Sequence, residues 1–299
     1  MQGFLNVDKP RGMTSFDVVR KIKKIIPRGI KIGHLGTLDP MAGGVLPLAI
    51  GKATRVIPYV EDERKVYIAQ FTLGAVSDTQ DAWGRVDYTG KKDFRAERLE
   101  GILQEFTGRI KQIPPMYSAV HHQGKRLYEL AREGITVARE EREIVIHSLE
   151  ILEINRDAEL PVIKIKVDCS RGTYVRTLGH DIGVKLGTGA LLSGLVRICS
   201  GRFNIEQASP LEKILQDQTS INHYLWPLDY PLTHLPAIQI DSREDLQAIM
   251  NGQAVAIKAR LPQGLIRVYS PENSLVALVR SNHEGAGMIK AERVFNKGA

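Results

Sequence analysis

The most unusual stretch of this chain is Gly33-His34-Leu35-Gly36-Thr37-Leu38-Asp39-Pro40-Met41-Ala42-Gly43-Gly44. Pro40 disfavours the helical conformation at Asp39, because the proline ring collides with the backbone of the residue before it. We therefore expect a tight, glycine-framed turn that presents the Asp39 carboxylate. Functional side chains often lie on such loops, although turn chemistry alone also explains these residue types.

The remaining motif content of the chain narrows the chemistry. His34 does not belong to a zinc-ligand spacing such as H-E-x-x-H, so a metal site is not expected. The sequence contains no phosphate-binding Walker motif, no G-x-G-x-x-G that opens a helix after a strand, and no G-x-S-x-G nucleophile elbow. A nucleotide hydrolase, a nicotinamide dehydrogenase and a serine hydrolase are therefore disfavoured.

Strand and helix patterns alternate irregularly over the first three quarters of the chain. Strands are predicted at residues 4–7, 66–73, 143–154 and 161–169. Helices are predicted from a cap at Thr14 or Ser15 to Ile26, and over residues 95–107 and 176–186, with a polar loop over residues 74–84. This mixed order indicates an α+β fold.

A cluster of three prolines (Pro227, Pro231 and Pro236) suggests a boundary between two units, residues 1–232 and 233–299. The second unit is predicted to open with a helix over residues 242–251. Short strands are expected to follow it, so the unit should be small and rich in β-structure. The expected strands are residues 254–257, 265–269, 275–280 and 288–294.

Charge and composition favour a polyanionic partner. The chain has 299 residues and a formal net charge of +7, and its first 34 residues carry eight basic against two acidic side chains. A solvated helix face would explain this local excess equally well. Cys169 and Cys199 permit one disulfide but no framework, and no apolar stretch is long enough to span a membrane. With no signal-peptide pattern at the N-terminus, a cytoplasmic location is expected.

Two later segments add candidate site residues. Residues 113–126 form a polar, basic stretch with Tyr117 inside it, which suits contact with RNA but also suits an ordinary surface loop. Residues 169–178 place Tyr174 and Arg176 where a helix begins. An arginine beside Asp39 would keep that carboxylate ionised. The spacing alone leaves open whether the two residues meet.

Six motifs in order make the chain recognisable: residues 3–15, 33–40, 65–67, 77–84, 113–119 and 171–178. Together they closely resemble the bacterial tRNA pseudouridine-55 synthases, the TruB family. The resemblance implies the pseudouridine-synthase fold, with a mixed, largely antiparallel sheet. It also implies that residues 233–299 form a PUA-like RNA-binding module.

The resemblance also implies roles for individual residues. Asp39 matches the catalytic aspartate, Arg176 its arginine partner, and Tyr67 the tyrosine that stacks on the flipped base and is a candidate proton acceptor. Further substrate contacts are implied for His34 (in the space that the base vacates), Tyr174 and Leu195 (the uracil pocket) and Asp81 (the loop that approaches RNA). Leu35, Thr37 and Met41 depart from the residues common in the family, but Asp39-Pro40 is intact.

The implied activity is isomerisation of the T-loop uridine of tRNA to pseudouridine by a stand-alone monomer, with neither metal nor organic cofactor and without guide RNA. Whether Asp39 attacks the ribose C1′, attacks uracil C6 or assists a glycal route stays open. The main alternative is a non-catalytic tRNA-folding chaperone on the same scaffold, which would need tRNA contact but not Asp39.

Overall fold

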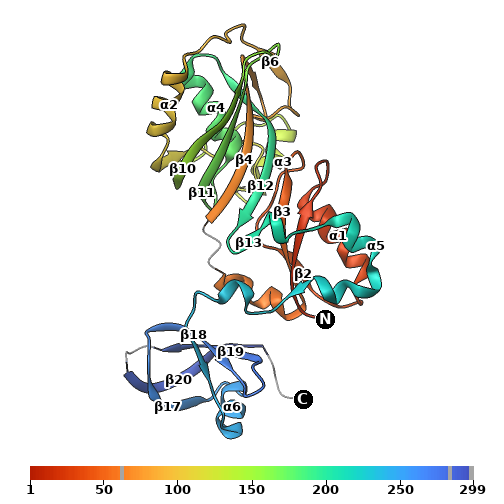
Figure 1. Ribbon diagram of the computed structural model, residues 1–299, viewed down its shortest axis with the longest axis vertical. Helices are drawn as coiled ribbons and strands as arrows, with labels where there is room; N and C mark the ends of the chain where they lie inside the picture. Colours follow the sequence, from red (N-terminus) through yellow and green to blue (C-terminus); the bar gives the residue numbers. More distant parts are fainter. Residues whose placement is uncertain (61–63, 282–284, 296–299) are drawn as a thin grey trace.

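The computed structural model describes residues 1–60, 64–281 and 285–295. Within these residues, two separate β-sheets dominate, one built from the first three quarters of the chain and one from its last quarter (Figure 1). The order of elements along the chain mixes strands and helices, as expected for an α+β fold.

The first sheet is mixed but largely antiparallel, as the resemblance implied. Only the pairings of β1 with β14 and of β3 with β12 run parallel among its described strands. Its main path is β14 (Ser209–Pro210), β1 (Gly3–Lys9), β3 (Gly43–Ile50), β12 (Ala190–Ser200), β4 (Arg64–Leu73), β11 (Val162–Ser170), β10 (Arg142–Asn155) and β7 (Gly108–Gln112). Three short strands pair at its side: β2 (Ile32–His34) with β3, β13 (Phe203–Asn204) with β12, and β15 (Leu225–Trp226) with β1.

The helices of the first part cover this sheet in two groups (Figure 1). The helices are α1 (Ser15–Ile25), α2 (Ala96–Glu105), α3 (Leu127–Arg132), α4 (Val175–Leu186) and α5 (Leu211–Gln216). α2 and α4 lie together beside β4, β10 and β11, whereas α1 and α5 lie together near β3. Two small hairpins, β5 (Ala75–Ser77) with β6 (Val86–Tyr88) and β8 (His121–His122) with β9 (Lys125–Arg126), stand outside the sheet.

α1 begins and packs as its sequence predicts. Thr14 is the N-cap: its side chain accepts from the backbone N–H of Asp17, and the Asp17 carboxylate accepts from the backbone N–H of Thr14. Val18 and Ile22 are fully buried against the sheet. Phe16, although apolar, is 68% exposed, because it falls on the side turned away from the buried stripe.

The second sheet has the order β16 (Ala237–Gln239), β18 (Gly264–Tyr269), β19 (Leu275–Ser281), β20 (Gly285–Val294) and β17 (Ala254–Leu261). α6 (Arg243–Met250) packs against it and is capped by the Ser242 side chain. The predicted small β-rich C-terminal unit is therefore present, with its helix and strands close to the expected positions.

An apolar cluster joins the two sheets. Phe4 of β1 and Val45 of β3 pack in one buried group with Leu275 and Leu278 of β19 and with Phe295. All five are at most 6% exposed. The second sheet is therefore docked on the first through buried apolar contacts rather than tethered by a linker alone.

Several sequence expectations need correction. β3 and β12, two central strands of the first sheet, were not predicted, and the stretch 74–84 is not all loop because it contains β5. Cys169 and Cys199 are both buried free thiols, so the possible disulfide is not formed. None of the helices in the described part of the chain is long and apolar enough to span a membrane.

Candidate active site

The backbone of the Asp39 turn is held at every residue. Each carbonyl oxygen from Leu35 to Met41 accepts a hydrogen bond, and most of the donors come from distant parts of the chain. Given in the order of the accepting residues from Leu35 to Met41, the donors are Lys65 Nζ, Arg197 Nη2, Arg197 Nη1, Ser15 Oγ, the Ala42 N–H, the Gly12 N–H and Arg11 Nε. A turn with so many fixed acceptors presents the Asp39 side chain in one orientation.

Arg197 of β12 supplies three of the bonds around this turn. It is only 1% exposed, and its guanidinium donates to the carbonyls of Val45 at 2.7 Å and of Gly36 and Thr37 at 3.2 Å each. Its backbone lies so close to Gly44 that a Cβ there would sit 2.2 Å from the Arg197 carbonyl oxygen, and Gly44 also has a φ of +99°. The glycine is therefore required for β3 and β12 to meet beside the turn.

Replacing Arg197 with lysine tests this support. A lysine ammonium is a point charge on a flexible stem and cannot reproduce a planar fork that serves three carbonyls. Leaving buried carbonyls without donors costs about 1–3 kcal/mol each, so we expect Arg197→Lys to lower the free energy of unfolding by roughly 2–4 kcal/mol. Urea unfolding measures this, with exposed Arg109→Lys as the control. Equal stability of the two variants would contradict the role.

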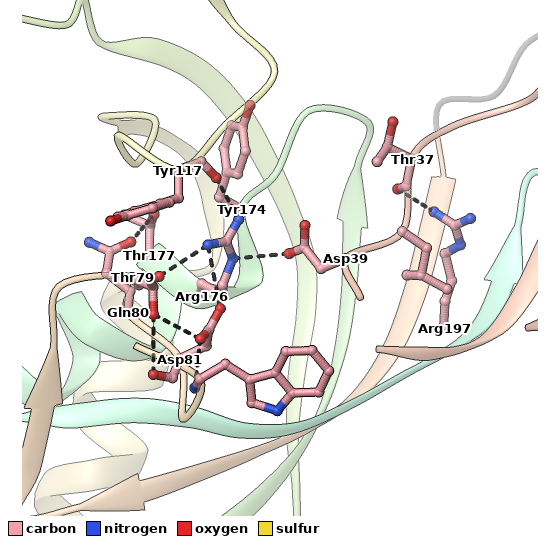
Figure 2. Close-up of polar contacts among 12 residues, drawn as sticks. Thr37, Asp39, Thr79, Gln80, Asp81, Tyr117, Tyr174, Arg176, Thr177 and Arg197 are labelled. Carbon is pink, nitrogen blue, oxygen red and sulfur yellow. Dashed lines mark hydrogen bonds and ion pairs between the residues drawn. The ribbon is translucent and has the colours of Figure 1, made fainter. Parts of the chain in front are cut away.

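Arg176, at the start of α4, links Asp39 to the neighbouring loops (Figure 2). Its Nε lies 2.9 Å from Oδ2 of Asp39, and its Nη1 lies 3.5 Å from Oδ2 of Asp81. The guanidinium also donates to the backbone carbonyls of Thr79 at 3.0 Å and Tyr117 at 2.9 Å. Its side chain is 6% exposed while that of Asp39 is 35% exposed, so a buried cation faces a carboxylate that remains open to a ligand.

Asp81 ties the loop between β5 and β6 to this arginine. Its side chain is 10% exposed, and Oδ1 accepts from the Thr79 hydroxyl at 2.8 Å and from the Trp83 N–H at 2.9 Å. Asp81 also forms a bridge with Leu192, one of the first residues of β12. Two carboxylates therefore share one guanidinium, and removing that guanidinium would leave like charges close together.

Tyr67 and Leu195 lie on one face of the sheet. Tyr67 of β4 pairs with Arg197 of β12, and the next pair on the same face is Ala69 with Leu195. Tyr67 is 8% exposed and Leu195 is 5% exposed. Burial raises the pKa of Tyr67 to about 12, an effect partly offset by the nearby Arg197, so the phenol is protonated at neutral pH.

Tyr174 and His34 lie at the edges of this group. Tyr174 is the N-cap of α4, fixed by reciprocal bonds in which its N–H donates to Oε1 of Gln112 and its carbonyl accepts from Nε2 of Gln112. His34 ends β2, directly before the Asp39 turn. Burial and the charge of Arg197 lower the pKa of His34, so its imidazole is neutral at pH 7. Among the described residues, neither side chain forms a hydrogen bond with Asp39.

The sequence expectations missed the residues that support the turn. Lys9 is fully buried, and its ammonium donates to the carbonyls of Pro10 and Met13. Burial lowers the pKa of Lys9 to about 8, against the opposing effect of the nearby Asp39. Arg197 lies outside the six motifs. Lys9 lies within the motif of residues 3–15 but was not singled out, because the sequence pattern does not show that its side chain is buried.

The described residues contain no cluster of histidine, cysteine and acidic side chains that could hold a metal ion. The site combines a partly exposed carboxylate, held by a bonded backbone and a buried arginine, with the Tyr67 ring and the Leu195 side chain on the neighbouring strands. This set suits nucleophilic or electrostatic attack on a flat, neutral ring system bound between them.

Solved structures with the same architecture define the fold class. The chain superimposes on the structure titled "Crystal Structure of a Cbf5-Nop10-Gar1 Complex" with a TM-score of 0.72 and 29% identity, covering 98% of this chain and 85% of that one. It also superimposes on a structure of an H/ACA RNP bound to a substrate RNA containing 2′-deoxyuridine, with a TM-score of 0.71, 28% identity, and coverage of 99% and 85%. The fold is that of the pseudouridine synthases.

Family models then give a finer assignment. Residues 20–175 match the model described as TruB family pseudouridylate synthase (N terminal domain), and residues 176–233 match the tRNA pseudouridylate synthase B C-terminal domain. The chain belongs to the TruB family of pseudouridylate synthases.

Curated relatives agree over nearly the full length. The tRNA pseudouridine synthase B of Syntrophomonas wolfei is 53% identical over 283 residues, which cover 95% of this chain and 94% of the relative. That of Clostridium novyi is 42% identical, covering 99% of this chain and all of the relative.

Proposed function

We propose that this chain converts the T-loop uridine of tRNA, at position 55, to pseudouridine. The observation that carries the proposal is the ion pair between the partly exposed Asp39 and the buried Arg176. Asp39 lies on a turn in which each backbone carbonyl from Leu35 to Met41 accepts a hydrogen bond. The family of the chain and the names of its relatives supply the reaction and the substrate class.

The proposed reaction is an isomerisation. The bond between ribose C1′ and uracil N1 breaks, the uracil turns, and a bond forms between C1′ and C5. The C5 hydrogen then leaves as a proton and N1 takes up a proton, so the product is an isomer of uridine. Atoms and electrons balance within the nucleotide, so the overall reaction needs neither redox partner nor co-substrate. Asp39 supplies the carboxylate, attacking C1′ or C6 or assisting a glycal route, and Arg176 holds it in place through the 2.9 Å contact.

The uracil is proposed to lie between Tyr67, Leu195 and Tyr174. Taking a base out of its stack costs a few kcal/mol, and stacking on an aromatic ring returns about 1–3 kcal/mol. Tyr67 suits this stacking role. The raised pKa of Tyr67 means that its phenol is protonated at neutral pH and cannot accept the C5 proton directly. We therefore assign Tyr67 to binding of the base rather than to general-base catalysis.

The remaining contacts concern the rest of the RNA. A neutral His34 at the edge of the turn suits the space left by the flipped base, because it can stack without adding charge. Asp81 is proposed to act through Arg176 rather than on the RNA directly, since its carboxylate is buried on that side chain. The unit 233–299 is proposed as a PUA-like module that grips the tRNA, and the enzyme as a monomer that works without guide RNA.

Release of the C5 hydrogen tests the proposal. A T-stem-loop transcript with tritium at C5 of its uridines should lose one tritium equivalent per RNA to water in the presence of the wild-type protein. A transcript with cytidine in place of the target uridine is the control and should release none. Tight RNA binding with no release from the uridine transcript would overturn the proposal and favour the chaperone alternative.

A further inference from the structure

Trp83 is a large aromatic side chain left in water on an otherwise fixed loop. It is 59% exposed, although indole rings are usually mostly buried in folded proteins. A single exposed apolar residue needs no functional explanation by itself. The case for Trp83 depends on its loop, on its neighbours and on its position relative to Asp39.

The loop that carries Trp83 is rigid at the backbone. The Asp78 carboxylate accepts from the N–H of Arg85, and Ser77 Oγ donates to the Asp81 carbonyl. A Cβ at Gly84 would lie 2.3 Å from both Asp78 Oδ1 and Thr79 Oγ1, so a larger residue next to Trp83 would displace the Asp78 and Thr79 side chains. Trp83 therefore lies on a loop whose backbone is fixed by hydrogen bonds.

Contacts lead from Trp83 directly to the reaction centre. The backbone N–H of Trp83 donates to Oδ1 of Asp81 at 2.9 Å. Oδ2 of Asp81 lies 3.5 Å from Nη1 of Arg176, and Nε of Arg176 lies 2.9 Å from Oδ2 of Asp39. Two ion pairs and one hydrogen bond thus separate the Trp83 backbone from the catalytic carboxylate. The exposed indole therefore belongs to a residue whose backbone is bonded to the Asp81–Arg176–Asp39 network.

A second exposed group lies two residues further on. The Arg85 side chain is 82% exposed, and its contact with Asp87 is long, at 4.0 Å, and equally exposed. An exposed indole and an exposed guanidinium two residues apart on one loop match a nucleotide, whose base can stack on the ring while its phosphate meets the cation. An acidic peptide would satisfy the arginine but would leave the indole face without a flat partner.

We propose that Trp83 stacks on an unpaired nucleobase next to the target uridine, with Arg85 on the adjoining phosphate. The inference rests on the proposed function, because it takes RNA as the substrate. Trp83 is a binding residue in this scheme. It holds the unpaired RNA of the T-loop next to the site, while Tyr67 and Leu195 hold the flipped base.

Three variants test the stacking. Trp83→Ala keeps the backbone N–H that anchors Asp81, so only the ring is lost. We expect it to weaken binding of the T-stem-loop by roughly 5- to 150-fold, the equivalent of one stacking contact, with the single-turnover rate at saturating RNA within about twofold of wild type. Trp83→Phe should recover most of the affinity. Tyr88→Ala removes another exposed aromatic from the same hairpin and should bind like wild type.

Fluorescence gives a readout that does not depend on catalysis. In a Trp226→Phe background Trp83 is the only tryptophan, and its emission should be quenched when the T-stem-loop binds. Unchanged emission on binding, or wild-type affinity in Trp83→Ala, would overturn the inference even if pseudouridine forms normally. Quenched emission without tritium release would leave the stacking intact and overturn the proposed function instead.

Discussion

Replacing Asp39 with asparagine should lower the single-turnover rate of pseudouridine formation by at least about 10⁴-fold. The change is nearly isosteric but removes the negative charge that a nucleophile needs, and losses of this order follow when a covalent catalyst is deleted. The amide oxygen can take the place of Oδ2 beside Arg176, which keeps its other contacts with Asp81 and with the carbonyls of Thr79 and Tyr117. Stability and RNA affinity should therefore change little.

The measurement is tritium release from excess enzyme and a labelled T-stem-loop, read together with a filter-binding curve for the same RNA. Asp157→Asn, an exposed aspartate in a turn far along the chain, controls for loss of one surface charge. If Asp39→Asn released tritium within tenfold of the wild-type rate, the carboxylate could not be the catalytic group.

Replacing Arg176 with methionine should have the second-largest effect. Removing one partner of a buried ion pair costs about 3–5 kcal/mol, because the other charge is left uncompensated. Here two carboxylates, Asp39 and Asp81, would lose their shared cation, and the Thr79 and Tyr117 carbonyls would lose a donor. If that cost falls on the orientation of Asp39, the rate drops by about 10²- to 10⁴-fold.

Arg176→Lys separates charge from geometry. A lysine keeps the cation but cannot contact both carboxylates and both carbonyls, so its rate should lie between those of the wild type and Arg176→Met. Arg109→Lys alters an exposed pair with Glu143 and should leave the rate unchanged. A rate for Arg176→Met at the wild-type level, measured on protein shown to be folded by circular dichroism, would remove Arg176 from the mechanism.

The sequence predicted best those elements whose patterns are local. β10 and β11 alternate apolar and polar residues along their length, and α1 carries its own capping box at Thr14 and Asp17. These signals require no knowledge of partners. The predicted and observed bounds of such elements therefore agree to within a few residues.

The two central strands β3 and β12 were not predicted from the sequence. β3 is buried on both faces, so it shows no alternation, and it opens with Gly43-Gly44 and contains Pro47. β12 carries irregularities between Leu192 and Gly194 and again between Arg197 and Cys199, and each one shifts the side chains to the other face. β10 has two similar irregularities and its alternation is still visible, so the larger difference is that β12 is buried at most of its positions and its apolar residues do not alternate with polar ones.

The candidate site divides in a similar way. Asp39 could be singled out from Pro40 and the surrounding glycines, and Arg176 was a candidate from its place at the start of a helix, but the pairing of the two was predicted only through the resemblance to a family. Arg197 and Lys65 could not be found from spacing, because they reach the turn from positions far along the chain and act on backbone atoms that carry no sequence signature.

The apolar cluster between the two sheets has a consequence for how the chain is made. Phe4 belongs to the first strand synthesised and Phe295 to the last residues that the structure describes, yet both are buried in the same group. At a translation rate of about 5–20 residues per second, roughly 15–60 seconds separate the two side chains on the ribosome. Until β19 has been synthesised, the apolar face of β1 has no partner from the second sheet, and the group is completed only with Phe295. The nascent chain must therefore shield this face, on itself or on a chaperone, until these residues emerge.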